Sequence, residues 1–152
     1  MVDHARQLIF IYGTLRENGP YGAVSQQFER VAKNILTDAP AFTLREFSSI
    51  SRPDDTSPGM SRVETHDPDA GRVRGDIIVV SDIAEMDRVE GFNSENPLDL
   101  NNKYFREAFQ RFNGQIVSAY FVNENVKKVI DRPHPNIIFD AQERAYEWVL
   151  AR

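Results

Sequence analysis

The sequence has no cysteine among its 152 residues. That absence excludes disulfide bonds, thiolate nucleophiles and thiolate metal ligands. The only three histidines, His4, His66 and His134, lie far apart in the chain, and none belongs to a metal-binding pattern such as HExxH. We therefore expect a protein that uses neither a metal nor another cofactor.

Long apolar runs and an excess of basic charge are also missing. No stretch approaches the ~18 apolar residues of a membrane-spanning helix, and the opening "MVDHARQ" lacks the apolar segment of a secretion signal. With 23 acidic and 18 basic residues, the chain has a formal net charge of −5 and no basic stripe for a nucleic-acid backbone. We predict a cytoplasmic protein that binds neither membranes nor nucleic acid, and the sequence leaves its oligomeric state open.

The residues that are present suffice for one folded domain. The chain is 41% hydrophobic and 11% aromatic, and a chain of this length buries roughly two thirds of its unfolded surface. We predict a single domain over residues 1–152. Because expected strands outnumber expected helices, the predicted class is α+β, a small mixed and mainly antiparallel β-barrel with flanking helices.

Two hairpins are predicted from turn residues. Asn113 and Gly114 form the pair that a type I′ turn prefers, and they separate two strand-like segments at 104–112 and 115–123. A second hairpin is predicted around the segment "DPDAG" at 67–71. Polar stretches between such elements, including "NENVKK" after the first hairpin, are interpreted as solvated loops.

Two helices are predicted near the ends of the chain. Val24, Phe28 and Val31 are spaced by four and three residues, which is typical of one apolar helical face. Near the other end, Asp140 and Glu143 have the spacing of a capping box and precede a segment with helical apolar spacing. This pattern predicts a C-terminal helix that packs on the sheet.

A first candidate site follows the apolar strand expected at residues 8–12. Gly13, Thr14 and Leu15 form a turn whose backbone N–H groups have no strand partner, and such arrays attract carboxylates and other anions. Gly13 is expected either to adopt a positive φ or to let a ligand approach the turn. The spacing to Gly19 fits neither a P-loop nor GxGxxG. Taken alone, these residues fit a plain glycine turn better than an anion site.

A second candidate site lies on a helix predicted at residues 81–92, which begins with a Ser-Asp capping pair and ends with Gly91. At 100° per residue, Ile83, Met86 and Glu90 share one stripe, so a carboxylate lies on the face that should be buried. Burial would raise the pKa of Glu90 toward neutrality, as suits a general base. Alternatively, Glu90 sits in a frayed last turn and pairs with a basic residue at the surface. Periodicity alone favours neither.

Four segments together carry a resemblance to the γ-glutamylcyclotransferase-like superfamily. They are "FIYGTLRENG" at 10–19, "SPGM" at 57–60 leading to "VRGDIIVV" at 73–80, "MDRVEGF" at 86–92 and "YFREAF" at 104–109. They occur in the order that the family has, and the Tyr-Gly-Thr-Leu element with a later Glu-Gly is the most specific combination.

The resemblance implies a nearly closed β-barrel with helices outside and a pocket at one end. It further implies that the pocket holds a γ-glutamyl head group, with backbone N–H groups on its carboxylate, and that Glu90 is the catalytic acid or base. The expected reaction is an intramolecular aminolysis that releases 5-oxoproline and a free amine. By the same likeness, the substrate-binding residues are Tyr12, Gly13, Thr14, Leu15 and Tyr104.

Other functions stay open at this stage. A non-catalytic barrel could bind an amino-acid-like small molecule or a partner protein and keep Glu90 as a binding or structural carboxylate. The enzyme could also act on another γ-glutamyl amine in a biosynthetic or nucleotide-modifying pathway. In addition, the segment 93–103 between Glu90 and Tyr104 is longer and more polar than the resemblance leads us to expect, and it could cap the pocket or narrow the substrate range. The sequence does not specify the leaving amine.

Overall fold

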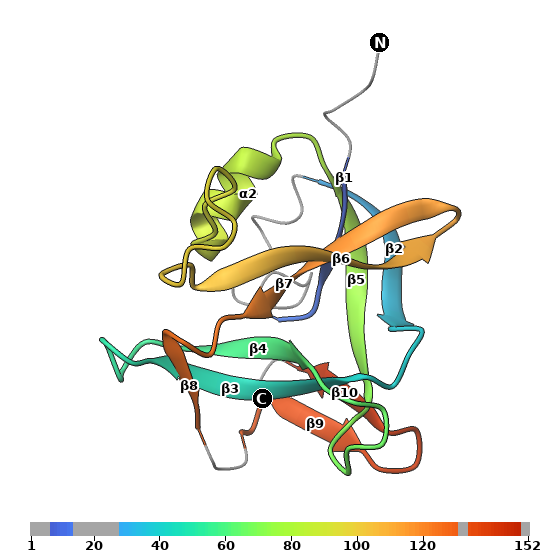
Figure 1. Ribbon diagram of the computed structural model, residues 1–152. Coiled ribbons are helices and arrows are strands. Elements are labelled where there is room, and N and C mark those ends of the chain that lie inside the picture. Colours follow the sequence, from blue (N-terminus) through green and yellow to red (C-terminus); the bar gives the residue numbers. More distant parts are fainter. Residues whose placement is uncertain (1–6, 14–27, 131–133, 150–152) are drawn as a thin grey trace.

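The computed structural model describes residues 7–13, 28–130 and 134–149, and its main feature is a curled, barrel-like sheet of ten strands (Figure 1). The elements, in chain order, are β1 (Gln7–Ile11), β2 (Glu29–Leu36), β3 (Phe42–Ser49), β4 (Thr56–Arg62), β5 (Arg72–Val80), α2 (Ile83–Glu90), β6 (Tyr104–Phe112), β7 (Gln115–Val122), β8 (Lys127–Val129), β9 (Ile137–Asp140) and β10 (Ala145–Trp148).

The strands run in the order β8-β3-β4-β7-β1-β5-β10-β9, with β2 added on β5 and β6 added on β7. Neighbours are parallel at β1 with β7, β4 with β7 and β10 with β5, and the other pairs are antiparallel. Phe42 and Gly71 exchange two backbone hydrogen bonds, of 3.0 and 2.8 Å, and so join β3 to the start of β5. The sheet therefore curls back on itself.

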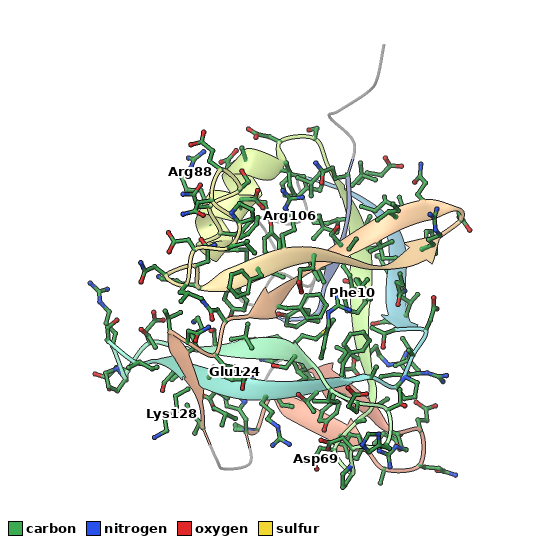
Figure 2. All side chains as sticks on the ribbon, viewed as in Figure 1. Phe10, Asp69, Arg88, Arg106, Glu124 and Lys128 are labelled. Carbon is green, nitrogen blue, oxygen red and sulfur yellow. The ribbon has the colours of Figure 1, made fainter. Side chains whose placement is uncertain are left out.

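Strand β1 lies in the middle of the sheet and is buried on both faces. Leu8 and Phe10 point into the barrel core, and Figure 2 shows Phe10 at its centre. Ile9 and Ile11 point to the other face and belong to a second apolar cluster, which includes Met86 of α2. Burial on both faces explains why the segment is a continuous apolar run rather than an alternating one.

The predicted fold class, α+β with flanking helices around a mainly antiparallel barrel, is wrong. Within the described residues α2 is the single helix, and three parallel strand pairs make the sheet mixed. No helix in that part of the chain is long and apolar enough to cross a membrane. Of the helix predicted around Val24, Phe28 and Val31, Val24 lies outside the described residues, Phe28 forms a bend and Val31 belongs to β2.

The predicted C-terminal helix is also wrong, because the segment folds as β9, a turn and β10. The carboxylate of Asp140 accepts hydrogen bonds from the backbone N–H groups of Gln142 and Glu143, at 2.9 and 3.2 Å. Asp140 thus caps a turn rather than a helix. Arg144, the last residue of this turn, has a φ of 52°, in the left-handed region. Such side-chain to backbone bonds serve turns as well as helix starts.

Two local predictions are confirmed. Asn113 and Gly114 have φ angles of 50° and 79°, and they connect β6 to β7 as an antiparallel hairpin. Helix α2 begins after Asp82, whose side chain accepts a hydrogen bond from the backbone of Glu85, and it ends at Gly91, which has a φ of 70°. Both elements have turn or cap residues with strong intrinsic preferences.

The hairpin predicted around 67–71 is wrong. The strands on its two sides, β4 and β5, are not neighbours, since β4 pairs with β3 and β7, whereas β5 pairs with β1, β2 and β10. A turn does form there, with the backbone N–H of Ala70 donating to the carbonyl of Asp67 at 3.0 Å, but the partners of the strands are set by the barrel.

Candidate active site

A pocket of about 460 Å³ lies where β1, α2, β4, β6 and β8 meet. Tyr12, Gly13, Glu90 and Tyr104, which come from three separate places in the sequence, all line this pocket. Thr14 and Leu15, the other two residues of the proposed binding turn, lie outside the described residues. The fold thus brings together every predicted site residue that it describes.

Glu90 is the last residue of α2 and faces the pocket. Met86, one turn earlier, is buried in the apolar cluster, whereas Glu85 is exposed on the opposite side. None of the described residues donates a hydrogen bond to the Glu90 carboxylate. Burial raises the pKa of Glu90 from 4.5 to about 7, and the nearby Lys127 ammonium opposes part of that shift.

Tyr104 begins β6 and lines the pocket through its ring. Its hydroxyl donates to the carbonyl oxygen of Pro58 at 2.9 Å and lies 2.8 Å from the Ser57 hydroxyl. Since the phenol has only one proton and gives it to Pro58, Ser57 must be the donor to Tyr104. Burial raises the pKa of Tyr104 far above 10, so the phenol stays neutral.

Tyr12 contributes its ring to the pocket, but its hydroxyl is bound to the protein. The hydroxyl donates to the backbone oxygen of Tyr120 on β7 and accepts from the backbone N–H of Met60 on β4, at 3.2 Å. Both of these bonds are buried. Tyr12 therefore connects the end of β1 to its neighbour β7 and to β4, the next strand beyond it.

Gly13 lies directly beside Pro58. Its φ is not positive, so of the two expectations for this glycine, a positive φ or the close approach of a ligand, the first is not met. A Cβ atom at this position would lie 2.8 Å from Cγ of Pro58, which is closer than real side chains approach. The close packing of β4 against the end of β1 is what requires glycine here.

Lys127 is a pocket residue that the sequence analysis assigned to a solvated loop. It is 4% exposed, and its ammonium donates to the Ser57 hydroxyl at 3.1 Å and lies 5.1 Å from the centre of the Tyr104 ring. The neighbouring Lys128 is exposed and points outward (Figure 2). No local pattern distinguishes the two lysines, because Ser57 is 70 positions away in the sequence.

Asp87 is a second residue that was missed, and it fixes α2 on the sheet. Its buried carboxylate accepts two hydrogen bonds from the Arg106 guanidinium, at 2.8 and 3.2 Å, and one from the Tyr120 hydroxyl, at 2.6 Å. Figure 2 shows Arg106 beside α2 and Arg88 on the outer side of the helix. Because Tyr120 also lines the pocket, this network connects the helix that presents Glu90 to the pocket wall.

The segment 93–103 is an ordered series of turns between Glu90 and Tyr104. The side-chain amide of the buried Asn123 donates to the carbonyl oxygens of Leu100 and Asn102, at 3.0 and 2.6 Å. The backbone N–H of Lys103 donates to the carbonyl of Gly91 at 2.9 Å. These bonds set the start of β6 against the end of α2.

No cluster of three or more potential metal ligands occurs in the described part of the chain.

No family model and no curated protein matches the sequence. Two solved structures share the fold. The c4763 protein of uropathogenic Escherichia coli is 17% identical with a TM-score of 0.50, and the match covers 82% of this chain and 87% of that one.

The second structure is the allophanate hydrolase of Kluyveromyces lactis, which is 11% identical with a TM-score of 0.53. The match covers 82% of this chain but only 19% of the hydrolase. At these identities the similarity concerns the fold alone. The chain thus shares its overall architecture with c4763 and with one part of the hydrolase.

Proposed function

We propose that the protein is a γ-glutamylcyclotransferase-type enzyme. In the reaction, the α-amine of a γ-glutamyl compound attacks its own γ-carbonyl carbon. A new C–N bond closes the five-membered lactam 5-oxoproline, the original amide C–N bond breaks, and a free amine leaves. The observation that carries the proposal is the Glu90 carboxyl, which has a pKa of about 7 and accepts no hydrogen bond from the described residues, in a pocket with Tyr12, Gly13 and Tyr104.

Glu90 has the basicity that this reaction needs. The substrate ammonium, with a pKa near ~8, must lose a proton before its nitrogen can attack. Transfer to a carboxylate whose pKa is 4.5 would be unfavourable by about 5 kcal/mol, but transfer to one at about 7 costs only about 1.4 kcal/mol. Glu90 then returns the proton to the leaving amine, so that protons balance over the cycle.

The pocket also has the size and walls to hold a folded substrate. Its volume of about 460 Å³ is in the range of small-molecule sites, and two tyrosine rings, Tyr12 and Tyr104, form part of its surface. A pocket that holds the α-amine near the γ-carbonyl carbon restricts the substrate to the reactive conformer. This restriction can lower the activation free energy by several kcal/mol.

The negative charge that develops on the carbonyl oxygen needs a donor. Tyr104 gives its only hydroxyl proton to Pro58 and is therefore a poor donor to the substrate. We assign this role to the backbone N–H groups of Gly13, Thr14 and Leu15, the first candidate anion site of the sequence.

The test is a panel of γ-glutamyl amino acids, γ-glutamyl amines and glutathione, with 5-oxoproline measured by mass spectrometry. Glu90→Gln should lower kcat at least ~100-fold and change KM far less, because glutamine keeps the size but cannot accept a proton. The matched control is Glu85→Gln, which changes an exposed carboxylate of the same helix and should behave as wild type.

The results also separate the enzyme from a binding protein. A non-catalytic barrel would form no 5-oxoproline from any compound, and Glu90→Gln would alter only its affinity. Undiminished turnover in the Glu90 variant would disprove its role as the base.

A further inference from the structure

Two lysines line the same pocket as Glu90. Lys127 and Lys103 both line the pocket, and the charge of Lys103 is close enough to lower the pKa of Lys127. Burial is the larger cause of that lowering, and Asp55 and Glu90 oppose it. Two neighbouring ammonium groups repel each other, and an anion bound between them would offset this repulsion.

The hydrogen bonds of Lys127 leave donors free for a ligand. An ammonium has three N–H donors, and among the described residues the Ser57 hydroxyl, at 3.1 Å, is its one acceptor. Three hydrogen bonds follow one another, and in each the first group is the donor: Lys127 donates to Ser57, Ser57 to Tyr104, and Tyr104 to the Pro58 carbonyl. Ser57 is thus held as an acceptor for Lys127, and its own proton is in use, which argues against a nucleophilic serine.

No carboxylate of the described residues forms an ion pair with Lys127, although the side chain is almost completely buried. A buried charge is costly, and because Asp55 and Glu90 act on Lys127 without forming an ion pair, a bound anion would reduce the cost that remains. The cavity in front of the ammonium is the space that such an anion can occupy.

We propose that Lys127, held in place by Ser57, binds a carboxylate group of the ligand. The choice of ligand rests on the proposed function. A γ-glutamyl amino acid has two carboxylates, one on the glutamyl group and one on the leaving amino acid. If Lys127 binds the first, it recognises the γ-glutamyl head group, and if it binds the second, it selects amino acids over simple amines as leaving groups.

Three probes distinguish these sources. γ-Glutamylglycine has both carboxylates, γ-glutamylmethylamide has only that of the glutamyl group, and 4-aminobutanoylglycine has only that of the leaving group. Dissociation constants are measured by calorimetry in a Glu90→Gln background, so that turnover does not consume the ligand. Lys127→Met removes the ammonium, and Lys128→Met is the matched control at the exposed neighbour.

Lys127→Met should weaken the binding of γ-glutamylglycine about tenfold to a hundredfold, as expected for a charge-assisted hydrogen bond. The variant should also bind one single-carboxylate probe more weakly by the same factor, namely the probe that retains the recognised carboxylate. Its affinity for the other single-carboxylate probe should not change. In the protein with Lys127 intact, the probe that lacks the recognised carboxylate should bind more weakly than γ-glutamylglycine by a similar factor. This comparison tests the proposal even where Lys127→Met does not fold.

Equal affinity of all three probes for the protein with Lys127 intact, or no measurable binding of any of them, would overturn the proposal. So would a folded Lys127→Met variant that binds γ-glutamylglycine as tightly as Lys128→Met does. If the probes bind as expected but wild type forms no 5-oxoproline, the cyclotransferase proposal fails while the carboxylate site stands.

Discussion

At the scale of single residues, Glu90 combines two properties that rarely occur together, a carboxyl group at a helix end and a neutral-range pKa. Helix ends are usually hydrated, and their carboxylates keep low pKa values. Here the apolar cluster under α2 and the wall of β6 exclude water from one side of Glu90, and among the residues that the structure describes Lys127 alone supplies a favourable charge. Burial raises the pKa of Glu90 and the Lys127 ammonium lowers it, and the balance of the two sets its value.

This balance has a consequence for stability that can be measured. The folded-state pKa of Glu90, about 7, is above the unfolded value of 4.5, so the native state holds the proton more tightly. Wild type should therefore lose stability as pH rises from about 4.5 to about 7, whereas Glu90→Gln should not. In urea unfolding, the variant should be more stable than wild type by about 1 to 3 kcal/mol at pH 8 and nearly equal to it at pH 4.5.

Parallel pH profiles of the two proteins would contradict the raised pKa. The Glu85→Gln variant should follow wild type throughout, since its carboxylate is exposed.

Asp87 and Glu90, the two carboxyls on the inward face of α2, show how far sequence reasoning reaches at this scale. Glu90 could be placed on the buried face because it follows Ile83 and Met86 at helical spacing. Asp87 is four residues after Ile83 and three before Glu90, so the same period places it on that face, and this signal was available. The burial of Lys127 had no such signal, because it results from contacts with distant strands.

At the scale of elements, α2 depends on Asp87 for its attachment to the hairpin β6–β7. Removal of one member of a buried ion pair leaves the other without its counter-charge. Asp87→Ala should therefore destabilise the protein by about 3 kcal/mol in urea unfolding, because Arg106 and Tyr120 both lose an acceptor. Arg88→Ala, on the exposed side of the same helix, should change stability by less than about 0.5 kcal/mol.

A destabilisation by Asp87→Ala no greater than that by Arg88→Ala would show that apolar packing alone holds the helix. If the network matters as described, Arg106→Ala should have an effect of similar size, and the double variant should lose less than the sum of the two.

Elements with decisive local residues were predictable, and elements defined by distant contacts were not. Asn113 and Gly114 adopt positive φ at low cost and so specify the hairpin whatever surrounds it. Asp140 is equally suited to a helix start and to a turn, and local sequence does not decide between them. The barrel decides, since β10 pairs with β5 and buries Tyr146 and Trp148.

At the scale of the whole molecule, the curl of the sheet depends on a crowded junction at Gly71. Gly71 exchanges hydrogen bonds with Phe42, and the neighbouring Arg72 N–H bonds to the carbonyl of Arg144 at 2.8 Å. A Cβ atom on Gly71 would lie 2.6 Å from that carbonyl oxygen, so only glycine lets the three segments meet.

Gly71→Ala should consequently push β10 away from the start of β5. We expect a loss of about 1 to 3 kcal/mol, the usual cost of overpacking, together with faster hydrogen exchange at the amides of Phe42 and Arg72. Gly114→Ala is a useful comparison, because nothing lies within 4 Å of its added Cβ and its cost comes only from the positive φ. Unchanged exchange at Phe42 in Gly71→Ala would mean that the junction tolerates a side chain.

The central place of β1 has a further consequence, for the order of events during synthesis. Its partners β5 and β7 are made much later, and the Tyr12 hydroxyl finds its acceptor 108 positions down the chain. Until β7 has been translated, one edge of this apolar strand has no partner, and the nascent chain cannot assemble the pocket at the end of β1. Contacts so distant in sequence make folding slow, and they expose an aggregation-prone strand to chaperones in the interval.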